Sequence, residues 1–397
     1  EKGSYIFSLK RSFLDFVIQN SGLMAIPKYW TSQGKISYHI SPTQKLSFNV
    51  IGGIDEINIE GEDDPQTRSA ENVDFHSNQL TMGLTYKNLF SKKGYGIVSL
   101  SGNRVGLNTD VYRYLLDGEK QQYYGQDDAE WEMALKGDWV YRFNSKVETS
   151  FGFNAKSISL DYDNWWHGEP RNIYGYALSA NTPIMLISED DFWNDYFDQD
   201  SLWFESIATV GTYDSSETNN ILDFVKTGVF AQINFKPIDK LEVISGLRYE
   251  NVSYTGNGNI SPRLGISYGF SSLFKLNISG GRYYQSPFNI HLNSPNGDTK
   301  LLKNYYADQW AGGIEYFLSA DTRMIFEVYS KKYENMIAFD ILESSDGRDS
   351  LDYNMLVNIG EGESNGIEFF IQKKYTNNWY GSFAWSHSVA EGVDPRN

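Results

Sequence analysis

The chain has 397 residues and a formal net charge of −17, and its 28 Tyr, 24 Phe and 10 Trp make aromatic residues 16% of the total. It contains no cysteine, which excludes a disulfide framework and thiolate chemistry. The negative charge argues against a nucleic-acid partner, because binding to phosphates needs a concentrated basic surface.

Read in chain order, the first segments alternate between apolar and polar residues. We predict a first strand over 4–18, then a loop that carries Pro27, Tyr29 and Trp30. A second strand over 33–40 turns at 41–44 into a third, and a fourth follows over 79–87. A turn at 91–93 leads to a fifth strand from 94. The polar stretches 60–73 and 104–129 are predicted to be loops.

The sixth predicted strand gives the clearest pattern. Its apolar positions are Trp131, Met133, Leu135, Trp139, Tyr141 and Phe143, and they alternate with Glu132, Lys136, Asp138 and Arg142. A turn at 144–145 leads into a seventh strand over 147–160. The next 62 residues, 161–222, have no sustained period and are predicted to be a loop.

The alternation resumes in the second half of the chain and is strongest over 227–287. Strands are predicted to begin at about 223, 241, 259, 273, 308, 322, 363 and 379, with loops at about 285–307 and 334–362. The alternation persists for roughly 12–14 residues, whereas strands of soluble proteins usually end after about 5–6. Such length is typical of tilted strands that cross a bilayer, with apolar residues toward lipid and polar residues toward a watery lumen.

The predicted fold is therefore all-β: a transmembrane antiparallel β-barrel with long extracellular loops and tight periplasmic turns. We find about 15 strands, of which the first and the last both run from the short-turn side to the long-loop side. A closed bacterial barrel has an even number of strands. We therefore expect residues 1–397 to form one barrel domain that is incomplete at both ends.

Charged residues on the inward faces are the first candidates for function. They form a structural network in one interpretation and contact substrate in the other. These residues are Glu132, Lys136, Arg142, Glu242, Arg248, Glu250, Arg323, Glu327 and Lys331.

The stretch 161–200 supplies two further candidates. Its aromatic side chains either contact ligand or pack the loop against itself, since long unstructured loops are often functional; they are Trp165, Trp166, His167, Trp193, Tyr196 and Phe197. Its acidic side chains either bind a divalent cation or form a solvated loop, and they lack the spacing of a calcium loop; they are Glu189, Asp190, Asp191, Asp195, Asp198 and Asp200.

One catalytic motif is matched by chance. Residues 362–366 read G-E-S-N-G, which fits the G-x-S-x-G nucleophile elbow. That elbow needs a strand before it and a helix after it, whereas 367–374 alternates as a strand. We therefore predict no catalytic residue, and the sequence indicates no metal constellation and no cofactor.

Several short segments resemble one known family, the TonB-dependent outer-membrane receptors. They are YIFSLKRSFLD at 5–15, FKPIDKLEVISGLRY at 235–249, ISPRLGISY at 260–268, GGRYYQSP at 280–287 and NIGEGESNGIEFFIQKK at 358–374. The resemblance implies a parent barrel of 22 strands filled by an N-terminal plug domain. Two strands would then precede this sequence and five would follow it, and the plug with its TonB-contacting segment would lie outside it.

The resemblance also implies a function and a location. The protein would lie in the outer membrane of a Gram-negative bacterium and import a scarce nutrient, such as a siderophore or an oligosaccharide, with energy delivered by TonB. Its partners would be outer-membrane lipid, the TonB complex through the plug, and the small-molecule or oligosaccharide ligand. A surface lipoprotein is a further candidate partner. Two alternatives stay open: an unplugged diffusion porin, and a soluble β-rich carbohydrate-binding or hydrolase domain.

Overall fold

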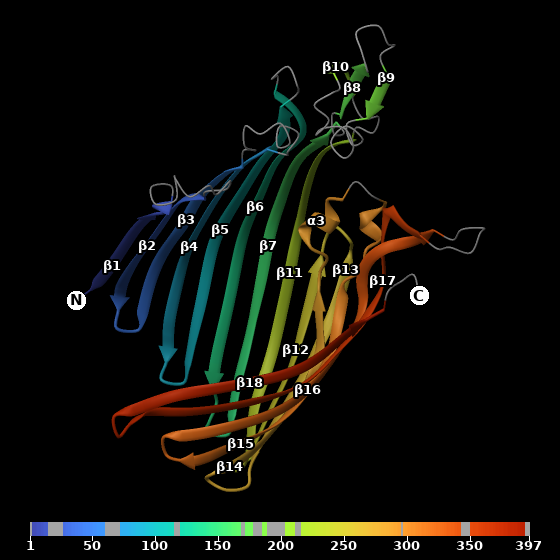
Figure 1. The fold of residues 1–397 in the computed structure, drawn as a ribbon. Coiled ribbons are helices and arrows are strands. Elements are labelled where there is room, and N and C mark those ends of the chain that lie inside the picture. Colours follow the sequence, from blue (N-terminus) through green and yellow to red (C-terminus); the bar gives the residue numbers. More distant parts are fainter. Residues whose placement is uncertain are drawn as a thin grey trace.

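The computed structural model describes residues 2–14, 27–59, 72–114, 120–167, 171–177, 185–188, 203–210, 216–294, 297–342 and 350–393. Almost all of them belong to long strands that lie side by side in one open, curved sheet (Figure 1). Within these residues, no helix is both long enough and apolar enough to cross a membrane.

The first half of the chain forms β1 (Gly3–Arg11), β2 (Lys28–Ser41), β3 (Gln44–Ile59), β4 (Asn72–Ser91), β5 (Gly94–Tyr114), β6 (Lys120–Arg142), β7 (Val147–Trp166), β8 (Arg171–Ala177), β9 (Met185–Ser188) and β10 (Trp203–Val210). The second half forms β11 (Ser216–Ile238), β12 (Leu241–Val252), β13 (Asn257–Gly269), β14 (Phe274–Gln285), α3 (Asn289–Leu292), η2 (Thr299–Leu301), β15 (Tyr305–Ser319), β16 (Thr322–Leu342), β17 (Ser350–Thr376) and β18 (Trp379–Gly392).

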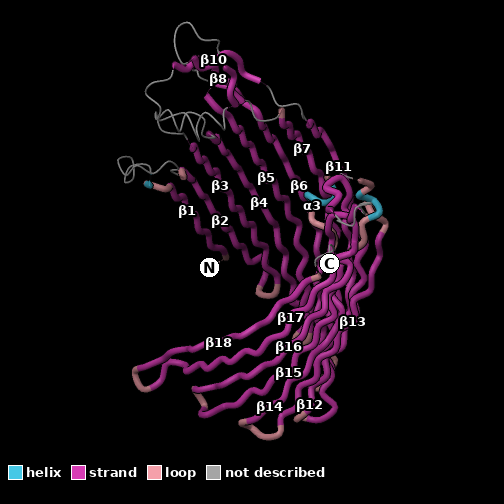
Figure 2. The backbone as a smooth tube through the Cα atoms, turned by 45° about the vertical axis from the view of Figure 1, so that its right-hand side comes forward, coloured by secondary structure: helices cyan, strands magenta, loops and turns pink. Residues whose placement is uncertain are grey.

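The main sheet contains 15 strands, each paired with its neighbour in sequence order, and β7 pairs directly with β11. The predicted strand number is therefore confirmed. Strands β8, β9 and β10, which lie between β7 and β11 in the sequence, form a separate three-stranded sheet. Tight turns close one end of the main sheet (Figure 2); at the turn between β17 and β18, Asn377 and Asn378 adopt φ values of 53° and 65°, which suits a two-residue hairpin.

The apolar rows of these strands are exposed on one face of the sheet. Trp131, Met133 and Leu135 are 52%, 57% and 41% exposed, and strand register places Leu100 of β5 directly opposite Leu135. Residues directly opposite each other in an antiparallel pair point to the same face. The exposed rows thus form a continuous apolar surface, as expected where a sheet contacts lipid.

The apolar row ends where the strands leave the membrane. Toward the long-loop side, the outward positions of β6 and β7 change from Trp131 to Asp127, Asp161 and Asp163, and these carboxylates are exposed. Ionised carboxylates are costly in hydrocarbon, so the membrane boundary lies near Trp131. At this level the guanidinium of Arg104 lies 5.1 Å from the Trp131 ring centroid, a pairing suited to the headgroup region.

The predicted boundaries were wrong on the long-loop side. Residues predicted as loops continue the strands: β5 and β6 cover most of 104–129, β7 and β11 extend into 161–222, and β16 and β17 extend into 334–362. Outside the hydrocarbon the outward face of a strand meets water, so the apolar-outward alternation disappears while the backbone pairing continues. Tyr29 and Trp30, predicted in a loop, likewise belong to β2.

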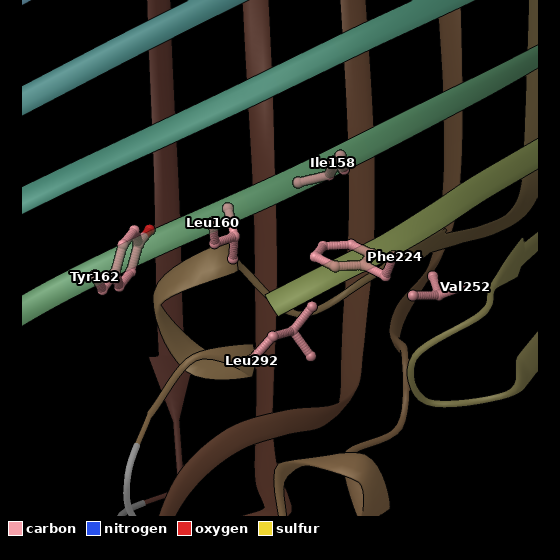
Figure 3. Close-up of a cluster of buried hydrophobic side chains, with 6 residues drawn as sticks. All are labelled: Ile158, Leu160, Tyr162, Phe224, Val252 and Leu292. Atoms are coloured by element: carbon pink, nitrogen blue, oxygen red, sulfur yellow. The ribbon is translucent and has the colours of Figure 1, made fainter. Parts of the chain in front are cut away.

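Residues 286–294 and 297–304, which we call the inward loop, lie between β14 and β15 and fold onto the lumen side of the sheet. The loop carries α3 and η2, and Leu292 of α3 packs beside Leu160 of β7 and Phe224 of β11 (Figure 3). Ile158, Tyr162 and Val252 complete this buried cluster. It is a small apolar core on a wall that carries mainly polar side chains, and it fixes the loop inside the lumen.

Candidate functional site

The charged residues predicted to face the lumen share one face of the sheet, which we call the lumen wall. Register from β6 through β7, β11 and β12 to β16 puts them all on the face opposite the exposed apolar rows. These are Glu132, Lys136, Arg142, Glu242, Arg248, Glu250, Arg323, Glu327 and Lys331. Their contact with a substrate stays a prediction.

Several of these side chains form ion pairs along the wall. Lys136 Nζ lies 3.0 Å from Asp138 Oδ2, and Arg142 Nη2 lies 2.7 Å from Glu148 Oε2. Other pairs are Arg248 Nη2 with Glu250 Oε1 at 2.7 Å, Lys236 Nζ with Glu242 Oε1 at 3.5 Å, and Arg323 Nη1 with Glu315 Oε1 at 3.6 Å. All of these side chains retain solvent exposure, so each pair contributes little to stability. Together the pairs, which we call the charged ladder, make the lumen wall polar.

The inward loop is attached to this wall by hydrogen bonds at both of its ends. At the first end, Lys226 Nζ donates to Ser286 Oγ at 2.9 Å and Asn289 Nδ2 donates to Glu130 Oε2 at 3.0 Å. At the other, Asn257 Nδ2 donates to the Leu302 carbonyl and Asn304 Nδ2 donates to Asn259 Oδ1, both at 2.7 Å.

Asn358 of β17 also anchors the C-terminal end of the inward loop, at Lys303. Its Oδ1 accepts from the Lys303 backbone N–H at 2.6 Å, and its Nδ2 donates to the Lys303 and Asn335 carbonyls at 3.1 and 2.7 Å. Asn335 itself has a φ of 59° and lies where the pairing of β16 with β17 is irregular. The loop is therefore a built part of the lumen wall.

Glu130 is the residue through which the wall supports α3. It accepts hydrogen bonds from Tyr162 as well as from Asn289, so one carboxylate joins β6, β7 and the loop. Burial, followed by the adjacent Glu130 carboxylate, raises the pKa of Tyr162 well above its ordinary value. The phenol therefore remains a proton donor to Glu130 at neutral pH.

Of the aromatic residues predicted to contact a ligand, the structure places Trp165 and His167 together on one face of the sheet and Trp166 on the other. Trp165 lies opposite Gly125 and Glu217 on the outward face, and its ring centroid is 4.5 Å from that of His167. His167 Nε2 lies 3.6 Å from Glu217 Oε1. Trp166 points to the other face, opposite Tyr124, because neighbouring residues of a strand alternate. A shared ligand contact by this pair of tryptophans would need the ligand to meet both faces.

The remaining loop candidates lie outside the described residues. They are Trp193, Tyr196 and Phe197, and the acidic group Glu189, Asp190, Asp191, Asp195, Asp198 and Asp200. In the part of the chain that the structure describes, no three His, Asp or Glu side chains are grouped as a metal site would require.

The G-x-S-x-G match lies inside a strand. Residues 362–366 belong to β17 and pair in regular register with both β16 and β18. Ser364 is opposite Lys331 and Ala390. Neither a sharp turn nor a following helix is present at this position, so the geometry of a nucleophile elbow is not formed.

Sequence reasoning missed the residues of the inward loop and their supports. Lys156 and Lys226 occupy inward positions of their strands and could have been found from the alternation alone. Ser286, Phe288 and Asn289 carried no signal, because nothing in a polar, Pro-containing connection indicates which way it folds.

The described geometry matches known membrane barrels. Solved structures with a similar fold include the outer membrane transporter YddB from Escherichia coli, with a TM-score of 0.63, 11% identity and coverage of 94% of this chain and 50% of that one. The RagAB peptide importer gives a TM-score of 0.64 at 11% identity, covering 99% and 49%. A ferric enterobactin receptor (PfeA) mutant from Pseudomonas aeruginosa gives 0.58 at 15% identity, covering 99% and 57%.

The chain thus spans about half the length of these solved chains. No curated protein sequence matches it. The family model described as "TonB dependent receptor-like, beta-barrel" matches residues 28–397. That match covers nearly the whole chain and agrees with the exposed apolar face of the sheet. Together they exclude the alternative of a soluble β-rich domain. The chain belongs to the TonB-dependent receptor family of Gram-negative outer-membrane β-barrel proteins.

Proposed function

We propose that the full-length protein is a plugged outer-membrane importer that takes up a scarce nutrient with energy from TonB. The observation that carries this proposal is the lumen wall. The 15 paired strands form a broad sheet whose inner face carries ion pairs, and a barrel of so many strands is wider than its own side chains fill. A plug domain would occupy that space, and the charged ladder would face it.

The proposed partners follow from the same arrangement. Lipid contacts the exposed apolar rows, and the TonB complex would act on the plug. The titles of two similar structures name a peptide importer and a ferric enterobactin receptor, so peptides and siderophores are both candidate ligand classes here, together with oligosaccharides. A surface lipoprotein would cover the long-loop side. Transport without catalysis is sufficient to account for the residues of the lumen wall.

The unplugged diffusion porin is the competing function, and electrical conductance distinguishes the two. The full-length protein in a planar bilayer should show no steady conductance, because the plug blocks the lumen. A porin of this width would conduct continuously. A steady open conductance would overturn the proposal.

TonB dependence provides the second test. Cells that express the full-length protein should deplete a specific compound from the medium, as measured by mass spectrometry of the spent medium. Depletion should stop when either this protein or TonB is deleted. Continued depletion without TonB would favour the porin.

A further inference from the structure

A cavity of about 520 Å³ lies between the lumen wall and the inward loop. The wall contributes Glu132, Lys156 and Lys226, and the loop contributes Ser286, Phe288 and Ile290. This volume is in the range of small-molecule sites. The cavity lies at the level of Trp131, since Glu132 follows it on β6, and therefore near the extracellular boundary of the membrane.

Two of the four charged groups that border the cavity form an ion pair with each other: Lys156 Nζ lies 2.9 Å from Glu132 Oε1. Glu130 accepts hydrogen bonds from Tyr162 at one oxygen and from Asn289 at the other. Glu130 therefore keeps its negative charge, but both of its oxygens already have a hydrogen-bond donor.

Lys226 differs from its neighbours. Its ammonium donates one hydrogen bond, to the neutral Ser286 hydroxyl, and no carboxylate of the described residues lies within ion-pair distance of it. An ammonium has three N–H donors, so two of them are available at the cavity. Phe224 lies on the same face, with its ring centroid 5.4 Å from the Lys226 Nζ, which further lowers the polarity around the charge.

The loop side of the cavity presents apolar surface. Phe288 and Ile290 are 56% and 68% exposed although the loop that carries them is fixed at both ends. Pro287, directly before Phe288, is buried. Exposed apolar side chains on an anchored, lumen-facing loop are suited to contact a molecule that enters from outside.

We propose that this cavity binds a small amphiphilic carboxylate, with the carboxylate on Lys226 and an apolar or aromatic group against Phe288 and Ile290. This proposal rests on the proposed importer function and specifies the ligand class at its extracellular side. Ser286 positions the ammonium, and the Glu132–Lys156 pair limits the cavity on the wall side.

The test is binding to the purified full-length protein in detergent, which requires no TonB. The probes are 4-phenylbutanoate, its neutral amide and the corresponding amine, measured by saturation-transfer NMR titration. A charge-assisted hydrogen bond predicts that the carboxylate binds about tenfold more tightly than the amide. Binding of the amine as tightly as the carboxylate, or no binding of the carboxylate because the plug covers the cavity, would refute the proposal.

Two variants and one control locate the site. Lys226→Met should remove the preference for the carboxylate over the amide, whereas Phe288→Ala should weaken both probes by a similar factor. Lys35→Met is the matched control, because Lys35 is another lumen-facing lysine, on β2 and far from this cavity. A carboxylate preference that survives Lys226→Met, or that is lost equally in Lys35→Met, contradicts the assignment.

The wild-type comparison of the three probes needs no variant, so the proposal can fail even if Lys226→Met does not fold. Failure of the importer function appears separately, as conductance or TonB-independent uptake. If the protein bound the carboxylate selectively but also conducted steadily, the proposed binding site would stand and the proposed importer function would be rejected.

Discussion

Replacement of Leu135 by arginine measures whether the apolar face of the sheet contacts hydrocarbon. Leu135 lies on β6, directly opposite Leu100 of β5 and Ala155 of β7. Trp131 and Trp139 lie four residues before and after it on the same face. At about 3.3 Å per residue and a tilt of about 40°, each indole is about 10 Å from Leu135 along the membrane normal. Leu135 is therefore close to the middle of the apolar band.

The expected cost follows from that depth. Arginine near the midplane of a barrel's lipid face costs roughly 2–4 kcal/mol of folding free energy, which is a factor of roughly 30 to 900 in the folding equilibrium. The assay is guanidinium unfolding of the full-length protein in lipid vesicles, followed by tryptophan fluorescence. The vesicles supply the hydrocarbon on which the effect depends.

Val140→Arg is the matched control, because it makes a similar apolar-to-arginine change on the same strand. Val140 lies opposite Ser150 on the lumen face, so its arginine would meet water, and the expected cost is below about 1 kcal/mol. Equal costs for Leu135→Arg and Val140→Arg would refute the assignment of the two faces and the membrane placement that follows from it.

Three further predictions concern the lumen side. Asn358→Ala should release the Lys303 backbone, cost about 1 kcal/mol and speed exchange of the Lys303 amide hydrogen, whereas Asn365→Ala on the outward face of β17 should leave that amide unchanged. A double-mutant cycle on Glu132 and Lys156, whose side chains are 33% and 40% exposed, should give a coupling below about 1 kcal/mol; a larger coupling would mean that the pair is shielded from water. Burial raises the pKa of Asp128, above the membrane boundary, so ionisation opposes folding: stability should be lost as pH rises from about 4 toward neutrality, and Asp128→Asn should stabilise the protein at pH 7 but not at pH 3.

The sequence predicted the membrane part of the fold well because lipid imposes a pattern. Trp131, Met133 and Leu135 must alternate with Glu132 and Lys136 when hydrocarbon lies on one side and water on the other. The period of two therefore identified the strands, their faces and their number. The same pattern predicts which charged residues face inward.

The extracellular part was poorly predicted for the corresponding reason. Above Trp131 the outward residues are Asp127, Asp161 and Asp163, so water meets the outward face of β6 and β7, while Leu160 and Tyr162 on the inward face are buried beneath the inward loop. The apolar-outward pattern of the membrane part is therefore lost, although hydrogen bonds between the strands continue through Tyr124 and Trp166. The tertiary position of Phe288 depends on hydrogen bonds that join its neighbours Ser286 and Asn289 to residues 60 and 159 positions away in sequence, which local patterns do not encode.

The acidic exterior and the proposed carboxylate site at Lys226 are compatible because of distance and screening. Asp161, the nearer outer carboxylate of β7, lies five residues beyond Lys156, and Lys156 is directly opposite Lys226. At about 3.3 Å per residue the separation is about 17 Å, and Asp161 also points to the opposite face of the sheet. At physiological ionic strength exposed charges are screened beyond about 8 Å. The outer carboxylates therefore hardly change the free energy of an anion at Lys226, and local contacts in the cavity determine which charge the site prefers.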